Sequence, residues 1–177
     1  MLKKITKISV FDFDSTLVLS PLPDKGRVIY KEKTGENWPH KGWWGREESL
    51  DDIVFDIPTN AEVIADYEIE RANSDTAVIM LTGRLQKLSK RVKEILDSRG
   101  LVFDGYYYNT GGTTLDSKIS TLNHLLEKYP DAIDVRLWDD RVSQVSTFEQ
   151  WGKDQCISGR LKDFKITVVA SEEGGMH

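Results

Sequence analysis

Cysteine is nearly absent from the 177-residue sequence, which has only Cys156. A single thiol cannot form a disulfide framework or a cysteine metal site within one chain. Long hydrophobic runs are absent as well, because no stretch approaches the roughly 20 apolar residues of a transmembrane helix. The segment 1–7 becomes charged too early for a signal peptide. We therefore expect a cytoplasmic protein without membrane association.

Histidine is also scarce, and the three histidines show no spacing typical of metal ligands. Hydrophobic residues make up 39% of the chain and charged residues 30%, as in ordinary soluble domains. The net charge of −5 disfavours a protein whose whole surface binds polyanions, but it leaves room for a local basic patch. We expect one domain over residues 1–170 and a flexible polar tail over 171–177. Nothing in the sequence indicates the oligomeric state.

Apolar segments with the composition of strands alternate with segments of helical periodicity. The expected strands are 5–13, 77–81, 101–108, 134–138 and 164–169. The expected helices are 59–72, 85–100, 114–129 and a weaker 140–151, with a capping box at Thr59 to Glu62 and a C′ glycine at Gly100. This alternation predicts an α/β fold: a three-layer, doubly wound, Rossmann-like and mostly parallel sheet that binds ligands at the carboxyl ends of its strands.

The segment 18–58 interrupts the alternation. It is rich in Pro, Gly and Trp and has no clean periodicity. We interpret it as an irregular insertion, or small cap, that overhangs the end of the first strand. Its three tryptophans favour packing of the insertion onto the core, with base stacking as the alternative.

The first strand ends in two aspartates, Asp12 and Asp14, for which a buried strand has no structural use. Side chains two residues apart in an extended chain project to the same side. Two carboxylates about 4 Å apart repel by roughly 1 kcal/mol in water and by about 4 kcal/mol at an effective dielectric constant of about 20. Such a pair requires a cation or a shared proton, which indicates a metal-assisted reaction. The structural alternative is a turn or cap at the end of the strand.

Two later strands also end in reactive polar residues, namely Thr82-Gly83-Arg84 and Asp139-Asp140-Arg141. The carboxyl ends of parallel strands share one edge of the sheet, so these residues can converge with Asp12. Lys118 falls within the apolar stripe of the expected helix 114–129, where a lysine must snorkel or meet an anion. Carboxylates bind a hard cation such as Mg²⁺, whereas lysine, hydroxyl and backbone N–H groups bind a phosphoryl group. The combination suits phosphoryl transfer.

The sequence resembles the haloacid dehalogenase (HAD) superfamily of phosphatases in four motifs that occur in the family's order: Asp12-x-Asp14-x-Thr16, an apolar run ending in Thr82, then Lys118, then Asp139-Asp140. The resemblance covers about residues 5 to 170. It narrows to the HAD domains called Swiss Army Knife RNA repair-like through Pro21-Leu-Pro23, Lys41-Gly-Trp-Trp44, Leu81-Thr-Gly-Arg84 and Trp138-Asp-Asp-Arg141. Ser15 departs from the superfamily's usual glycine, and Gln144 departs from the subgroup's usual histidine.

The resemblance implies a role for each matching residue. Asp12 would be the nucleophile that forms an aspartyl-phosphate, and Asp14 would be the general acid and base. Mg²⁺ would bind Asp12, the backbone carbonyl of Asp14, Asp139 and Asp140. The phosphate would bind Thr82, Gly83 and Lys118. Further substrate contacts are expected from Thr16, Arg84, Arg141, Trp43 and Trp44.

We therefore predict a Mg²⁺-dependent phosphohydrolase that acts on phosphomonoesters. A short insertion leaves the site open, which suits a large substrate such as a nucleic-acid end, in line with the RNA repair-like subgroup. Two alternatives stay open. One is a phosphatase of small metabolites or nucleotides, which the acidic net charge favours slightly, and the other is an inactive module that only binds phosphate. The acid at Asp14 favours phosphate-ester hydrolysis over the other chemistries of the superfamily.

Overall fold

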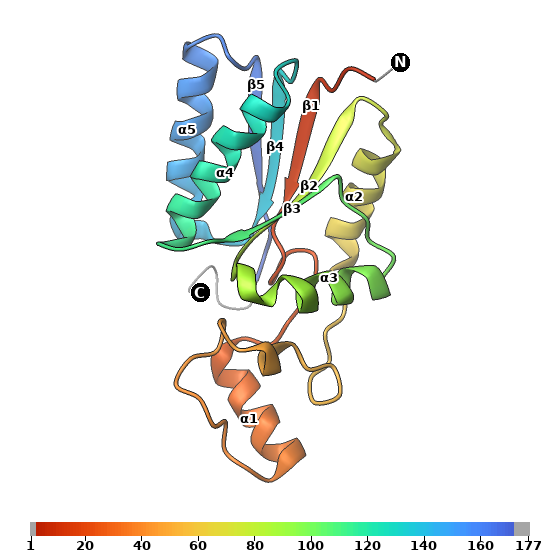
Figure 1. Ribbon diagram of the computed structural model, residues 1–177, viewed down its shortest axis with the longest axis vertical. Coiled ribbons are helices and arrows are strands. Elements are labelled where there is room, and N and C mark those ends of the chain that lie inside the picture. The colour runs from red at the N-terminus through yellow and green to blue at the C-terminus, as the bar shows by residue number, and fades with distance from the viewer. Residues whose placement is uncertain (1–2, 172–177) are drawn as a thin grey trace.

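Strand β1 (Lys7–Phe11) lies at the centre of a five-stranded sheet in the computed structural model, which describes residues 3–171. The strand order is β3-β2-β1-β4-β5, and every pairing is parallel (Figure 1). The other strands are β2 (Thr76–Leu85), β3 (Gly105–Asn109), β4 (Asp134–Asp139) and β5 (Asp163–Val168). The chain winds outward from β1 through β2 and β3 and then returns to β4, so the switch point of the sheet lies between β1 and β4.

Helices cover both faces of the sheet (Figure 1). They are α2 (Ala61–Ala72) and α3 (Ser89–Ser98) on one face, and α4 (Thr114–Lys128) and α5 (Val145–Ile157) on the other. The residues of β2 alternate between the two hydrophobic cores, because Val78 and Met80 pack with the first pair of helices and Ile79 with the second. The three-layer, doubly wound α/β fold predicted from the sequence is confirmed.

The strands that lead into the polar motifs differ from their predicted bounds. β1 ends at Phe11, and the polar segment that follows is a turn. β2 continues beyond residue 81, where the predicted strand ended, because after a register shift Leu85 still pairs with Asn109 of β3. The polar residues that follow Leu81 therefore stand on an extended strand, which holds them more firmly than a loop would.

The sequence predicted a capping box at the start of α2 and a C′ glycine at the end of α3. The capping box at α2 is wrong: the N-cap is Asn60 instead of Thr59, and within residues 3–171 its side chain makes no capping hydrogen bond. Gly100 follows the C-cap residue of α3 with a φ of +71°, which confirms the predicted C′ glycine.

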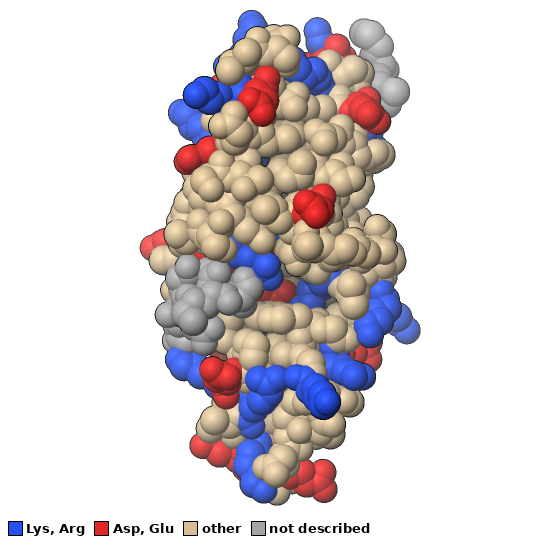
Figure 2. All heavy atoms as spheres, turned by 90° about the vertical axis from the view of Figure 1, so that its left-hand side faces the viewer, with Lys and Arg blue, Asp and Glu red and all other residues tan. Residues whose placement is uncertain are grey.

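The insertion over residues 18–58 leaves and re-enters the core through a narrow neck. The backbone N–H of Leu19 donates to the carbonyl of Pro58 at 2.7 Å, and that of Asn60 donates to the carbonyl of Leu17 at 3.0 Å. In Figure 1, β1 runs down towards the insertion, which lies below the carboxyl ends of the strands. Figure 2 shows that the surface is hollowed between the insertion, in the lower part of the view, and the core above it.

The insertion contains helix α1 (Pro23–Thr34) and a 3₁₀ turn (Glu47–Leu50), although its sequence has no clean helical period. Gly26 is the buried residue of α1, so no apolar stripe marks this helix in the sequence. A Cβ atom on Gly26 would lie 2.1 Å from Cη2 of Trp43, and glycine therefore lets the indole pack against the helix backbone. The ring of Trp43 also packs edge-on against Phe55, with centroids 5.5 Å apart.

The described chain ends at Ser171, shortly after β5. Residues 172–177 of the predicted flexible tail lie outside the described residues. No helix within residues 3–171 is long and apolar enough to cross a membrane.

Candidate active site

Three acidic side chains from the ends of two neighbouring strands meet at the switch point. Asp12 follows β1, and Asp139 and Asp140 stand at the end of β4. The register that pairs Phe11 with Trp138 brings these ends side by side, and the N–H of Asp12 donates to the carbonyl of Trp138 at 3.0 Å. One carboxylate oxygen from each of the three acids lies within 4.8 Å of the others, and all three residues are buried.

Lys118 projects from α4 into this acidic cluster. Its Nζ lies 2.6 Å from Oδ2 of Asp139 and 3.1 Å from Oδ1 of Asp12. Burial lowers the pKa of the Lys118 ammonium, but the two carboxylates outweigh it and raise the pKa above its usual value, so the group stays charged. The residue is 1% exposed, which excludes the alternative that it snorkels to solvent.

The surroundings of Asp12 disfavour its charged form. Burial raises the pKa of Asp12 well above its usual value, Lys118 opposes this shift, and the charges of Asp139, Asp140 and Asp14 add to it. Lys118 contacts two of the three carboxylates, those of Asp12 and Asp139. An all-oxygen donor set suits a hard divalent cation, and opposite oxygen ligands of Mg²⁺ are about 4.2 Å apart. Acids within 4.8 Å of one another fit such an ion.

Asp14 holds its carboxylate outside this cluster. Nε and Nη2 of Arg84 donate to its two oxygens at 2.8 Å each, and Oγ of Ser20 donates to Oδ1 at 2.5 Å. A bidentate pair of this kind fixes both the plane and the direction of a carboxylate. The predicted contribution of Asp14 to metal binding, through its backbone carbonyl, stays a prediction.

A cavity of about 90 Å³ opens beside the cluster and is lined in part by Thr82, Gly83 and Lys118. A water molecule takes up about 30 Å³ in the liquid, so the space suits a phosphoryl group better than a whole nucleotide. A Cβ atom on Gly83 would lie 2.4 Å from Cγ2 of Thr114, which explains the glycine at this position. Thr114 lines the same cavity, and the sequence analysis missed it. The sequence could have indicated Thr114, because Thr114 lies four residues before Lys118 and therefore on the same face of the helix.

The predicted substrate contacts divide into three groups. Thr16 is buried, and its Oγ1 lies 3.4 Å from Oδ2 of Asp12. Arg84, Arg141 and Trp44 line the small cavity. Trp43 does not, because it is 3% exposed and its Nε1–H donates to a backbone carbonyl of the insertion at 3.1 Å. The side chain of Trp43 is packed inside the insertion, and its contact with substrate stays a prediction.

Ser15, which stands where the superfamily usually has glycine, has a φ of +57°. A left-handed conformation costs a residue other than glycine roughly 1–2 kcal/mol. The turn after Asp14 therefore favours glycine, and the serine is held there under strain.

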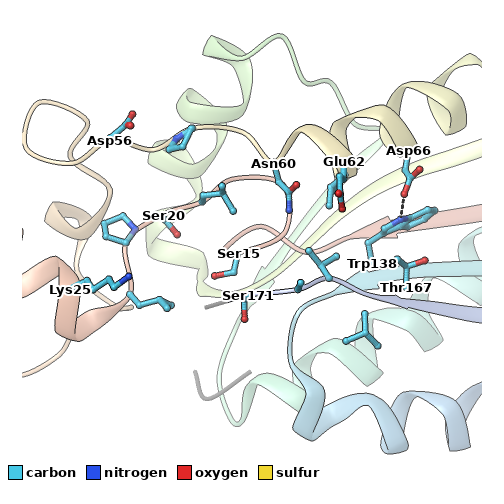
Figure 3. Close-up of a pocket in the computed structure, with 18 of the residues that line it drawn as sticks. Ser15, Ser20, Lys25, Asp56, Asn60, Glu62, Asp66, Trp138, Thr167 and Ser171 are labelled. Atoms are coloured by element: carbon cyan, nitrogen blue, oxygen red, sulfur yellow. Dashed lines mark hydrogen bonds between the residues drawn. The ribbon is translucent and has the colours of Figure 1, made fainter. Parts of the chain in front are cut away.

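A larger cavity of about 730 Å³ lies between the insertion, α2 and the end of β5 (Figure 3). Ser15 and Ser20 border it, and on its far wall Nε1 of Trp138 donates to Asp66 at 3.0 Å. Among the described residues, neither the three acids of the cluster nor Lys118 lines it. Asp12 and Lys118 line the smaller cavity instead.

The individual proteins that resemble this chain include a solved structure and a curated relative. The HAD domain of effector protein Lem4 from Legionella pneumophila is a solved structure with 12% sequence identity and a TM-score of 0.48, over 99% of this chain and 92% of that one. The uncharacterized protein YMR265C of Saccharomyces cerevisiae is 25% identical over 170 residues, which cover 83% of this chain. The match covers 37% of the yeast protein, so the chain spans little more than a third of that relative's length.

The family described as HAD domain family 1 in Swiss Army Knife RNA repair proteins matches residues 20–176. The matched segment contains Thr82, Lys118 and Asp139 and begins after Asp12 and Asp14. This likeness supports a phosphohydrolase of the HAD type in general terms. Because the match spans most of the sequence, the chain belongs to HAD domain family 1 of the Swiss Army Knife RNA repair proteins.

Proposed function

We propose that this protein is a Mg²⁺-dependent phosphohydrolase that cleaves phosphomonoesters through an aspartyl-phosphate on Asp12. The proposal rests mainly on the ammonium of Lys118, which bridges Asp12 and Asp139 at 3.1 and 2.6 Å beside a cavity of phosphoryl size. Attack on phosphorus requires an anionic nucleophile next to a cation that stabilises the phosphoryl oxygens. The buried cluster places Asp12 next to the ammonium of Lys118, and Mg²⁺ bound there would favour the anionic form of Asp12.

In the proposed first step, a carboxylate oxygen of Asp12 attacks phosphorus, and the bond between phosphorus and the ester oxygen breaks. Asp14 gives the departing oxygen its proton, so that an alcohol leaves. The hydroxyl of Thr82, the N–H of Gly83 and the ammonium of Lys118 stabilise the negative charge on the other phosphoryl oxygens.

In the second step, water attacks the phosphorus of the aspartyl-phosphate, and the bond to Asp12 breaks. Asp14 takes a proton from this water, and phosphate leaves. The carboxylate that accepts hydrogen bonds from Arg84 and Ser20 is the form required of a base. Mg²⁺ held by Asp12, Asp139 and Asp140 would offset the negative charge of the bound phosphoryl group.

We further propose nucleic-acid end phosphates as the substrate class. The small cavity accepts the phosphoryl group and leaves the rest of a substrate outside. Figure 2 displays Lys and Arg side chains along the insertion beside the hollow, where a polyanion would approach. The family's description, which names RNA repair proteins, agrees with this. The net charge of −5 instead favours a small-metabolite or nucleotide phosphatase as the second candidate.

The experiment measures release of phosphate from 3′- and 5′-phosphorylated oligonucleotides and from small phosphate esters, with Mg²⁺ or with EDTA. It tests both the phosphohydrolase activity and the substrate class. The wild type should turn over only with Mg²⁺, and Asp12→Asn should lose turnover while keeping its fold. Asp24→Asn, at a side chain that is 96% exposed, is the matched control and should remain active. A strong preference for small esters would refute the substrate class. No turnover of any ester would leave only a phosphate-binding module.

A further inference from the structure

Arg84 connects the candidate acid of the site to the insertion. Besides its two bonds to Asp14, its Nη1 donates to Oγ of Ser49 at 2.7 Å and to the backbone carbonyl of Trp44 at 2.9 Å. The guanidinium also stacks on the ring of Trp44, with its Cζ 5.0 Å from the ring centroid. The side chain of Arg84 is 1% exposed, so these bonds form away from water.

The hydroxyl of Ser49 is oriented to accept the hydrogen bond from Arg84. It is fully buried in the 3₁₀ turn of the insertion, where its own hydroxyl donates to the carbonyl of Arg46 at 2.6 Å. The hydroxyl proton is thereby fixed, and a lone pair is left for Arg84. The contact joins a turn of the insertion to β2, two segments that are 35 residues apart in sequence.

We infer that the segment 44–49 of the insertion positions Asp14 for proton transfer, acting through Arg84. The inference rests on the proposed function, in which Asp14 protonates the departing alcohol. Proton transfer requires hydrogen-bond distance, and a misplacement of about 1 Å can cost on the order of 100-fold in rate. Ser49 and Arg84 are thus positioning residues, and the insertion is a working part of the site as well as a cover over it.

A purely structural role for this contact is the competing hypothesis, because loss of a partner from any buried ion pair lowers stability. The two hypotheses differ in their dependence on the leaving group. An alkyl phosphate needs a proton on the departing oxygen, whereas dinitrophenyl phosphate releases a stable anion and needs almost none. The ratio of kcat/KM for the two esters therefore reports on Asp14, since kcat/KM covers only the steps up to release of the alcohol.

Ser49→Ala is the variant of choice because Ser49 does not line the small cavity. Its kcat/KM for an alkyl phosphate should fall about tenfold or more, and that for dinitrophenyl phosphate by less than about twofold. Ser9→Ala is the matched control, because Ser9 is also fully buried and its hydroxyl has no hydrogen-bond partner among residues 3–171. It should leave both values unchanged. Ser49→Cys keeps the size of the side chain with a weaker acceptor and replaces Ser49→Ala if the latter does not fold.

Each outcome decides the matter. A selective loss on the alkyl ester, in a variant with a normal melting curve, supports the inference. Equal losses on both esters, or no loss on either, overturn the inference and leave the proposed function intact as long as the wild type is active. A wild type that hydrolyses no phosphate ester, oligonucleotide end phosphates included, removes the proposed function and the inference together.

Discussion

The wild type and the Asp140→Asn variant should exchange their order of stability between EDTA and Mg²⁺. Without metal, the substitution removes one of three buried carboxylates that lie within 4.8 Å of one another. At that separation and an effective dielectric constant of about 20, each pair of charges repels by about 3.5 kcal/mol. The raised pKa of Asp12 relieves part of this repulsion already. The variant should therefore be more stable in EDTA, by on the order of 1 kcal/mol.

With Mg²⁺ at about 100 times its Kd, binding should stabilise the folded wild type by about 2.7 kcal/mol. For a domain of this size, each kcal/mol raises Tm by about 2–4 °C, so the wild-type Tm should rise by roughly 5–11 °C. Asp140→Asn lacks one of the three carboxylates and should gain much less. The wild type is then the less stable protein in EDTA and the more stable one in Mg²⁺.

Thermal unfolding in EDTA and over a series of Mg²⁺ concentrations at constant ionic strength measures both shifts. Asp24→Asn changes the net charge by the same amount at an exposed position and should follow the wild type throughout. An equal Mg²⁺ shift in the wild type and Asp140→Asn would refute the reasoning. So would an Asp140→Asn protein that is less stable than the wild type in EDTA.

Three further predictions concern single residues of the site. The pKa of Asp12 in the folded, metal-free chain is raised above the usual 3.8. Above pH 3.8 the folded chain therefore keeps a proton that the unfolded chain loses. The free energy of unfolding in EDTA should fall as the pH rises from 3.8. Urea unfolding of the wild type and Asp12→Asn over a pH series checks this, and equal pH slopes would contradict it. Ser15→Gly relieves the strain at a φ of +57° and should stabilise the protein by about 1 kcal/mol, whereas a lower Tm would argue against strain. Gly83→Ala places a Cβ atom 2.4 Å from Cγ2 of Thr114 and should destabilise by about 1–3 kcal/mol. Gly83→Ala with Thr114→Ala should recover most of that loss, and no recovery in thermal melts would exclude this contact as the cause.

The fold and the acidic cluster could be predicted because both follow from local patterns combined with one topological rule. Apolar runs and helical stripes mark the strands and helices of the core. The rule that parallel strands bind ligands at their carboxyl ends then places Asp12 beside Asp139. Lys118 was detectable because burying a charge within an apolar stripe is costly unless an anion meets it.

The structure of the insertion could not be predicted from the sequence, because its contacts depend on tertiary structure. Helix α1 packs against Trp43 of the insertion through Gly26, its buried residue, so no apolar stripe marks the helix in the sequence. The bond from Arg84 to Ser49 joins two segments that no local pattern connects. The burial of Trp43 follows from the fit of its ring against that same glycine, which composition alone does not indicate.

The central place of β1 has a consequence for the order in which the protein forms during synthesis. β1 pairs with β2 on one side and β4 on the other, and the partners of Asp12 lie on α4 and at the end of β4. At about 5–20 residues per second, a ribosome takes roughly 6–25 s to extend the chain from Asp12 to Asp139. For that time Asp12 lacks Asp139, and Lys118 is synthesised only 21 residues before Asp139. A nascent chain shorter than β4 therefore lacks the acidic cluster, and a Mg²⁺ ion bound as proposed would stabilise the protein only once β4 has been synthesised.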